Sequence, residues 1–246
     1  MSNFQGKVAL VTGASRGIGA SVAVMLAEGG ANVAINYRSK RQRAEKVASA
    51  VSASGSQALL VQADLTSGSQ LKQAIEQIKE KFDRLDLLIL NASGGLEKDK
   101  SADYAMELNL TSQLRAVDLA LPLIPSSGRI VFVTSHAAHF YGQKPVFPPM
   151  YEPVARSKKA GEEALRSRIP EFTNRGIQLI VVSGDLIEGT ITPKLMQRQM
   201  PDLIELRRQQ VGFVPTVEDF ARAIVNAAAD TKLKTGATIF VGSTHW

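Results

Sequence analysis

Seven short apolar runs recur along this chain, and a longer segment with helical periodicity separates most of them from the next. The runs lie at residues 8–11, 33–35, 58–61, 87–90, 130–133, 179–182 and 239–241. Between them, apolar residues recur at three- and four-residue steps, as at Ile18, Val22, Met25 and Leu26. Uninterrupted apolar runs are typical of strands buried on both faces, with helices as the connections between parallel neighbours. The pattern predicts an α/β fold with a doubly wound, mostly parallel seven-stranded sheet and helices on both of its faces.

The 246 residues are expected to form one domain, 1–246, because no repeat, low-complexity segment or linker divides them. Two irregular segments stand out: a proline-rich loop near residues 137–153, which we expect to border a substrate, and a lid-like insertion near residues 188–212. The apolar residues that could line a pocket are Phe140, Tyr141, Val146, Phe147 and Met150 in the loop, and Met196, Met200 and Leu203 in the insertion.

Composition narrows the possible functions. The chain has no cysteine, which excludes thiol nucleophiles, cysteine-ligated metals and disulfides, and we expect no metal site. No apolar stretch approaches the roughly 20 residues that span a bilayer, and the first residues do not resemble a signal peptide. We therefore expect a cytoplasmic protein with no membrane partner. The net charge is +6, but acidic and basic residues alternate, so we expect no nucleic-acid partner either.

A glycine-rich turn joins the first apolar run to the first helical segment, and it reads TGASRGIG over residues 12–19. Glycines allow a tight turn and a close approach of the backbone to a ligand. The helix that follows presents free N–H groups and a partial positive charge at its first turn. This turn therefore predicts a binding site for the diphosphate of a dinucleotide.

Further motifs follow in a fixed order, and with the glycine turn they resemble the short-chain dehydrogenase/reductase family over nearly the whole chain. They are Asp64 in ADL, Asn91-Ala92, Asn109 in ELN, GRIVFVTS at 128–135, Ser183-Gly184 and the last run from Thr235-Gly236 to Gly242. The resemblance implies a Rossmann-fold domain that binds a nicotinamide dinucleotide. The expected cofactor-binding residues are Gly13, Ser15, Arg16, Gly17, Ile18, Gly19, Asn36, Arg38, Ser39, Asp64, Leu65, Asn91, Ala92, Lys158 and Gly184.

The residues after the second apolar run favour NADP(H) over NAD(H). An acidic residue at this point binds the ribose 2′-hydroxyl of NAD and repels a 2′-phosphate. This chain has the neutral Asn36 there, followed by Arg38. Arg38 offers charge-assisted hydrogen bonds to a phosphate, and Arg16 in the glycine turn is expected to reach the same place.

The catalytic pattern of the resembled family is interrupted in this chain. In that family a serine orients the carbonyl oxygen and a tyrosine donates the proton. A lysine four residues after the tyrosine lowers its pKa and holds the ribose, and a helix asparagine positions a water. Ser135, Lys158 and Asn109 match three of these groups. Val154 stands at the tyrosine position, four residues before Lys158.

Two interpretations of this departure remain open. In the first, Tyr151 replaces the lost tyrosine from one turn earlier, and Pro153 occupies the first turn of the helix. In the second, the tyrosine function is absent, and either His136 or His139 acts as the acid or no reduction takes place.

Two functions follow from these interpretations. The first is an NADP(H)-dependent oxidoreductase that transfers hydride between nicotinamide and a small-molecule carbonyl or alcohol, with Ser135, Tyr151, Lys158 and Asn109 as its catalytic residues. The alternative is a catalytically impaired NADP(H)-binding protein or sensor. The family resemblance also implies a homo-oligomer, a tetramer or dimer, formed by the helices around residues 100–120 and 152–170.

Overall fold

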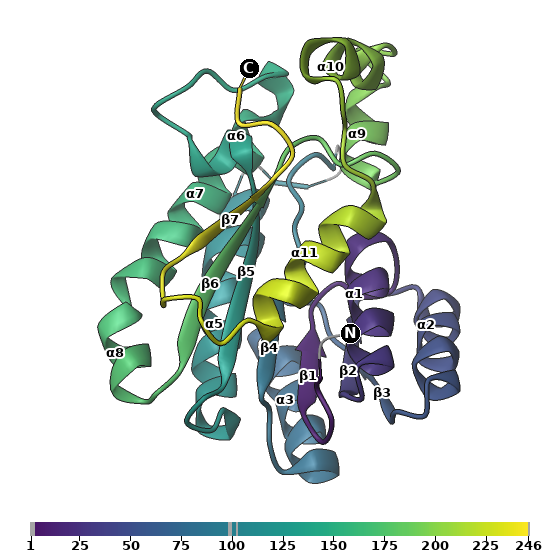
Figure 1. Ribbon diagram of the computed structural model, residues 1–246, viewed down its shortest axis with the longest axis vertical. Helices are drawn as coiled ribbons and strands as arrows, with labels where there is room; N and C mark the ends of the chain where they lie inside the picture. The colour runs from purple at the N-terminus through teal and green to yellow at the C-terminus, as the bar shows by residue number, and fades with distance from the viewer. Residues whose placement is uncertain (1–2, 98–99, 102, 246) are drawn as a thin grey trace.

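A single seven-stranded sheet forms the centre of the protein (Figure 1). The computed structural model describes residues 3–97, 100–101 and 103–245. The strands are β1 (Val8–Val11), β2 (Asn32–Tyr37), β3 (Ala58–Gln62), β4 (Leu87–Leu90), β5 (Arg129–Ser135), β6 (Gln178–Gly184) and β7 (Thr238–Val241). All six neighbouring pairs are parallel, in the order β3-β2-β1-β4-β5-β6-β7. Each predicted apolar run is confirmed as a strand, and the doubly wound parallel sheet is confirmed with it.

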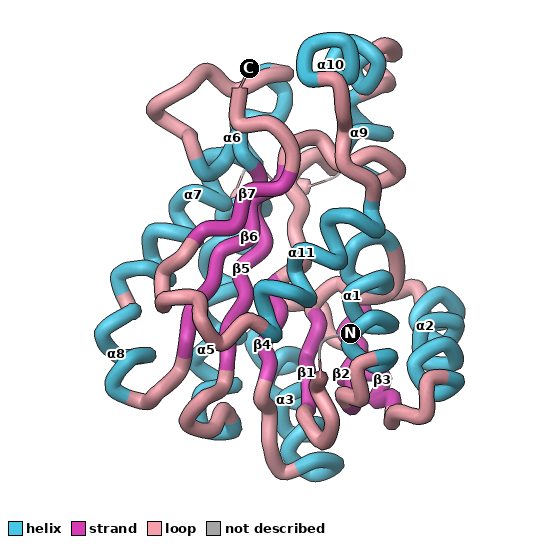
Figure 2. Tube along the Cα trace, viewed as in Figure 1, coloured by secondary structure: helices cyan, strands magenta, loops and turns pink. Residues whose placement is uncertain are grey.

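Helices cover both faces of the sheet, and the alternation of side chains along each strand explains why (Figure 2). In β1, Ala9 and Val11 belong to one apolar cluster, while Val8 and Leu10 belong to the other. Successive side chains of a strand point to opposite faces, so an unbroken apolar strand needs a cover on each side. The first cluster includes residues of α1 (Gly17–Glu28), α2 (Arg41–Ala53) and α11 (Val217–Ala229). The second includes residues of α3 (Gly68–Phe82), α5 (Ser112–Ala120), α7 (Glu152–Ser167) and α8 (Ile169–Asn174).

The remaining short helices are α4 (Tyr104–Met106), the π-helical turn η1 (Glu107–Thr111), and the 3₁₀ turns η2 (Leu121–Leu123) and η3 (Pro149–Tyr151), with α6 (His136–His139), α9 (Ile191–Met196) and α10 (Leu203–Val211). Of these, α6, α9 and α10 lie beyond the carboxyl ends of the strands, at the top of Figure 1. A third apolar cluster joins the proline-rich loop to the late insertion through Tyr151, Val154, Met196 and Leu203.

The strand order changes direction between β1 and β4, because the chain runs outward to β3 and then returns to the other side of β1. Ligands of open α/β sheets bind in the crevice outside the carboxyl ends of the strands at such a point. Within the described part of the chain, no helix is both long and apolar enough to cross a membrane.

Candidate active site

A cavity of about 810 Å³ opens at this change of strand order. Its wall includes every residue that the sequence predicted to bind the cofactor, from Gly13 in the glycine turn to Gly184 at the end of β6. It also includes Ser135, Tyr151 and Lys158. Asn109 is the one predicted site residue that is not on the wall. The lining thus divides into a cofactor end, formed by the segments after β1, β2, β3 and β4, and a catalytic end, formed by the segments after β5 and β6.

The glycine turn is shaped by two residues in left-handed backbone conformations and by one close contact. Gly13 has a φ of +64° and Gly17 a φ of +55°, values that side-chain-bearing residues rarely adopt. At Gly19, an added Cβ atom would lie 2.6 Å from the side-chain amide nitrogen of Asn91. Gly13 and Gly19 therefore lie against the segment that follows β4 with little room for a side chain, and the turn also lines the cavity.

Asn91 and Ala92 hold the turn through Thr12. The backbone N–H groups of both residues donate to Thr12 Oγ1, at 2.9 and 3.0 Å, and Asn91 Nδ2 donates to the Thr12 carbonyl at 2.9 Å. Thr12 Oγ1 in turn donates to the carbonyl of Ile89 at 3.2 Å. The matched Asn-Ala pair therefore fixes the position of the glycine turn relative to β4, besides lining the cavity.

Asn36 has a structural task at the end of β2. Its Oδ1 atom accepts a hydrogen bond from the Gly13 N–H at 3.0 Å, and its Nδ2 atom donates to the carbonyls of Val61 and Ala63. The side chain is buried and all its strong hydrogen-bonding directions point into the protein. Asn36 thus ties the glycine turn to β3, a role that the sequence alone did not suggest.

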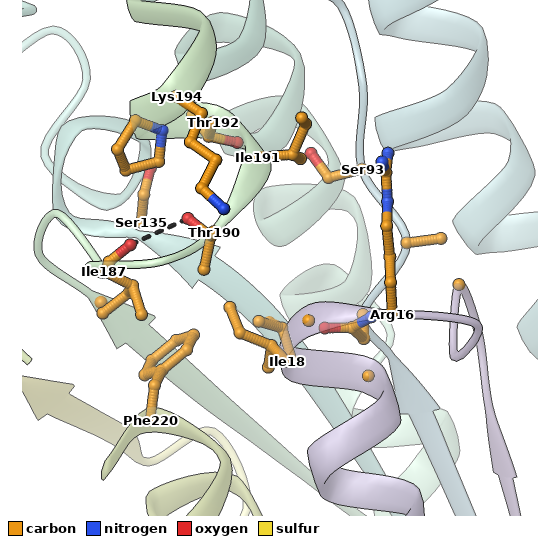
Figure 3. Close-up of a pocket in the computed structure, with 18 of the residues that line it drawn as sticks. Arg16, Ile18, Ser93, Ser135, Ile187, Thr190, Ile191, Thr192, Lys194 and Phe220 are labelled. Carbon is orange, nitrogen blue, oxygen red and sulfur yellow. Dashed lines mark hydrogen bonds between the residues drawn. The ribbon is translucent and has the colours of Figure 1, made fainter. Parts of the chain in front are cut away.

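Positive charge gathers where β2 ends. Arg16, Arg38, Lys40 and Arg43 all line the cavity, whereas the neighbouring Arg41 forms an ion pair with Glu45 at 2.8 Å. The side chain of Arg16 extends from the beginning of α1 past Ser93, as Figure 3 shows. Among the described residues, these four wall cations near the end of β2 form no ion pair with a carboxylate. Their charge is therefore available to an anionic ligand.

Tyr151 reaches Ser135 across the catalytic end. The Tyr151 hydroxyl donates to Ser135 Oγ at 3.1 Å, and Ser135 Oγ also accepts from the Ala138 N–H at 3.3 Å. Tyr151 ends η3 and is the N-cap of α7, whose first turn contains Pro153 as predicted. Its side chain is 7% exposed. Burial raises the pKa of Tyr151 above its usual value, and the hydrogen bond with Ser135 opposes this only in part.

Val154, at the position where the resembled family has its tyrosine, is buried in the third apolar cluster and faces Gly95. A valine there contributes no proton donor.

Lys158 lies on the wall of the same cavity, in α7, seven residues after Tyr151. Its side chain is almost fully buried, and its ammonium makes no hydrogen bond or ion pair with any residue that the structure describes. Burial lowers the pKa of Lys158 to about 8, against a smaller opposing effect of the Glu162 carboxylate. A buried cation without a partner is costly in a protein, so its presence at a cavity indicates a ligand-binding role.

Asn109 is buried behind the cavity, within η1. Its Nδ2 atom donates to the Gly94 carbonyl at 2.8 Å and to Ser157 Oγ at 2.9 Å, and its Oδ1 atom accepts from the Gly94 N–H. The structure therefore does not bring Asn109 to the wall together with Ser135 and Lys158, because backbone groups and Ser157 occupy its amide.

Neither histidine has the surroundings expected of the proton donor. His136 lines the cavity, but its Nδ1 atom is paired with Ser183 Oγ at 2.8 Å, and burial lowers its pKa to about 4. His139 does not line the cavity, and its Nδ1 atom bonds the Glu162 carboxylate at 2.8 Å. At neutral pH His136 carries no proton to donate as an imidazolium.

Only some of the loop and insertion residues that the sequence predicted to line a pocket lie on the wall of the cavity. Of the apolar loop residues named above, only Phe147 is on the wall, and it is half exposed. Phe140 instead stacks on Phe240, with the ring centroids 5.6 Å apart. From the insertion, Met196 and Leu203 are on the wall, whereas Met200 packs behind it.

Several wall residues were not predicted at all. Thr190 and Lys194 line the cavity from the insertion, and Figure 3 shows the Lys194 ammonium pointing toward Thr190. Asp185 and Arg207 form a nearly buried ion pair at 2.8 Å on the same wall. Tyr104 faces the cofactor end from α4. These residues come from segments whose course depends on tertiary packing, so no local motif marks them.

Comparison with known proteins supports the family resemblance that the sequence motifs predicted. A family model for short chain dehydrogenases matches residues 7–199. The 3-oxoacyl-[acyl-carrier-protein] reductase FabG of Staphylococcus epidermidis is 32% identical over 250 residues, which cover 96% of this chain and 97% of that protein. The hydroxynaphthalene reductase arp2 of Aspergillus fumigatus is 36% identical over 181 residues, which cover 70% of this chain and 63% of that protein.

Among solved structures, the angucycline C-6 ketoreductase LanV with bound NADP superposes with a TM-score of 0.83 at 30% identity, over 99% of this chain and 97% of that one. The reductase LugOII, which catalyses keto-reduction at C1 in lugdunomycin biosynthesis, superposes with a TM-score of 0.84 at 27% identity, over 99% of each chain.

Proposed function

Because the chain belongs to the short-chain dehydrogenase/reductase family, we propose that it is an NADP(H)-dependent carbonyl reductase in which Tyr151 donates the proton. The observation that carries this proposal is the 3.1 Å hydrogen bond between the Tyr151 hydroxyl and Ser135 Oγ on the wall of the cavity. Tyr151, at the N-cap of α7, thus supplies the proton donor that a valine at position 154 cannot provide.

The residues at the cofactor end fit NADP(H). Gly17 and Ile18 line the cavity at the first turn of α1, where backbone N–H groups have no partner within the helix and suit a diphosphate. Arg16 and Arg38 line the cavity without carboxylate partners among the described residues, as the extra phosphate of NADP(H) requires. Lys158 would hold the nicotinamide ribose through its buried ammonium.

NADPH, when bound, supplies a hydride to the carbonyl carbon. As the new C–H bond forms, the electron pair of the C=O double bond moves to the oxygen. Ser135 Oγ orients that oxygen with a hydrogen bond, and the Tyr151 O–H transfers its proton to it, which completes the alcohol. Water then returns a proton to the Tyr151 phenolate.

The protonation states suit this assignment. Burial keeps the pKa of Tyr151 above its ordinary value, so the phenol carries its proton at neutral pH but is a weaker acid than the lysine-lowered tyrosine of the resembled family. His136, with a pKa lowered to about 4, is neutral at the same pH. Tyr151 is therefore the better proton donor of the two groups beside Ser135.

The test is turnover with a panel of ketones, followed by NADPH absorbance. The panel should contain β-ketoacyl thioesters and polycyclic aromatic ketones, because the similar proteins include a 3-oxoacyl-[acyl-carrier-protein] reductase and an angucycline ketoreductase. Tyr151→Phe should lower kcat by about 10²–10⁴-fold, the usual contribution of a general acid, while the Kd for NADPH stays within about twofold.

Tyr141→Phe is the matched control. It removes the hydroxyl that donates to Glu152 at 2.6 Å and does not line the cavity, so it should keep wild-type turnover. Full activity in Tyr151→Phe would refute the assigned acid. Tight NADPH binding without turnover on any ketone would favour the non-catalytic alternative instead.

A further inference from the structure

Among the described residues, one hydrogen bond holds the Arg38 side chain, and it crosses the cofactor end of the cavity. Its Nη1 atom donates to the Tyr104 hydroxyl at 2.7 Å. Arg38 follows β2, whereas Tyr104 begins α4, and both residues line the cavity. The bond therefore joins two wall segments that are 66 residues apart in the sequence.

Tyr104 is suited to hold another side chain in place. Its ring is half-buried and packs against the second apolar cluster, and the Lys100 ammonium lies 5.1 Å from the ring centroid. A tyrosine has only two side-chain torsions, so fixing it costs little conformational entropy. Arg38, by contrast, is exposed and has a long side chain with several torsions, and an unrestrained arginine loses considerable freedom when it binds a ligand.

The chemistry of the partner decides what Arg38 can still do. Burial raises the pKa of Tyr104, so its phenol is neutral at physiological pH and accepts a hydrogen bond without cancelling the guanidinium charge. A carboxylate partner would cancel it, as Glu45 does for the neighbouring Arg41. A guanidinium has five N–H donors in a planar fork, so one bond to Tyr104 leaves enough donors for a bidentate contact with a phosphate.

We propose that Tyr104 is a positioning residue that sets the preference of this protein for NADP(H) by holding Arg38 ready to bind the 2′-phosphate. The proposal rests on the proposed function, in which Arg38 is the phosphate ligand. It assigns Tyr104 no contact with the reacting atoms.

The test separates the 2′-phosphate from the rest of the cofactor. Calorimetric titration with adenosine 2′,5′-bisphosphate and with adenosine 5′-monophosphate gives two dissociation constants that differ only through that group. Four proteins form a double-mutant cycle: wild type, Arg38→Gln, Tyr104→Phe and the double variant. Tyr141→Phe is the control for removal of a tyrosine hydroxyl outside the cavity.

Tyr104→Phe should weaken binding of the bisphosphate about three- to tenfold, the effect of losing one pre-ordered side chain, and leave the monophosphate within about twofold. In the Arg38→Gln background the same substitution should have no further effect on the bisphosphate, because the side chain that Tyr104 holds is gone.

Unchanged bisphosphate affinity in Tyr104→Phe, or equal weakening of both ligands, would overturn the role of Tyr104. If Arg38→Gln abolishes the preference but Tyr104→Phe does not, the proposed NADP(H) function stands and the positioning role fails. A wild-type protein that binds the two nucleotides equally would refute both.

Discussion

At the cofactor end of the cavity the buried polar side chains have protein partners, whereas at the catalytic end a buried ammonium has none. Asn36 makes three hydrogen bonds to the backbone of neighbouring segments, and Asn91 Nδ2 donates to the carbonyl of Thr12. Lys158 is about as buried as Asn36, but no described residue bonds its ammonium. Backbone groups supply the hydrogen-bond partners at the cofactor end, whereas at the catalytic end the Lys158 ammonium is left for a ligand.

Stability and function therefore make different demands on the two ends of the cavity. A satisfied buried amide stabilises the fold, because removing it leaves backbone groups unpaired. An unpartnered buried cation destabilises the fold and persists only where a ligand uses it. Substitutions at the two ends should therefore change stability in opposite directions, and three measurements test this contrast.

The largest effect is expected at Lys158. Lys158→Met should lower kcat by about 10²–10³-fold, the range for losing one electrostatic group that stabilises developing charge. The same variant without cofactor should be more stable than wild type by up to about 3 kcal/mol, because a pKa lowered from 10.5 to about 8 measures the cost of burying the charge. Denaturant unfolding measures the second quantity.

Lys159→Met is the control beside it. The Lys159 ammonium donates to the His139 carbonyl at 2.8 Å and does not line the cavity. It should keep its activity and gain no stability. A Lys158→Met protein that is less stable than wild type would contradict the view that its ammonium lacks a partner.

The same contrast explains how far the sequence could predict the structure. All seven strands follow from unbroken apolar runs, and the glycine turn follows from TGASRGIG, because short-range patterns determine both. Consequently every predicted cofactor residue lies on the wall of the cavity.

The catalytic end depends on packing between distant segments. The sequence left the direction of Tyr151 open, because Tyr151 precedes α7 and its placement depends on contacts with Val154, Met196 and Leu203 in the third apolar cluster. For the same reason no local motif indicated Tyr104 or Lys194. Asn109 shows the converse: its motif is present, but Gly94 and Ser157 occupy its amide away from the cavity.

The second expected effect is at Asn36. Asn36→Ala should lower the free energy of unfolding by about 2–4 kcal/mol, since the Gly13 N–H and two carbonyls of the β3 segment lose a buried partner. Because the glycine turn loses its tie to β3, NADPH binding should weaken as well. Asn32→Ala is a matched control on the same strand, where the side chain accepts only one exposed bond, from the Gln57 N–H. Equal losses for the two variants would contradict a special role for the cofactor end.

The third expectation is a pH dependence in which stability and cofactor use change in opposite directions. The pKa of Lys158 is lowered to about 8 in the folded protein and is 10.5 in its ordinary state, so between these values the unfolded chain holds a proton that the folded one has lost. The free energy of unfolding without cofactor should therefore rise with pH from about 8 to 10.5 in wild type, relative to Lys158→Met. Over the same range kcat/KM for NADPH should fall by at most about tenfold per pH unit, because the ammonium that holds the cofactor loses its charge.

Tyr151 adds no loss of activity below its raised pKa, and His136, with a pKa of about 4, adds none between pH 6 and 8. A rate that falls as pH rises through 6.5 would instead identify an imidazolium as the acid, and with it a catalytic end whose working proton does not come from Tyr151.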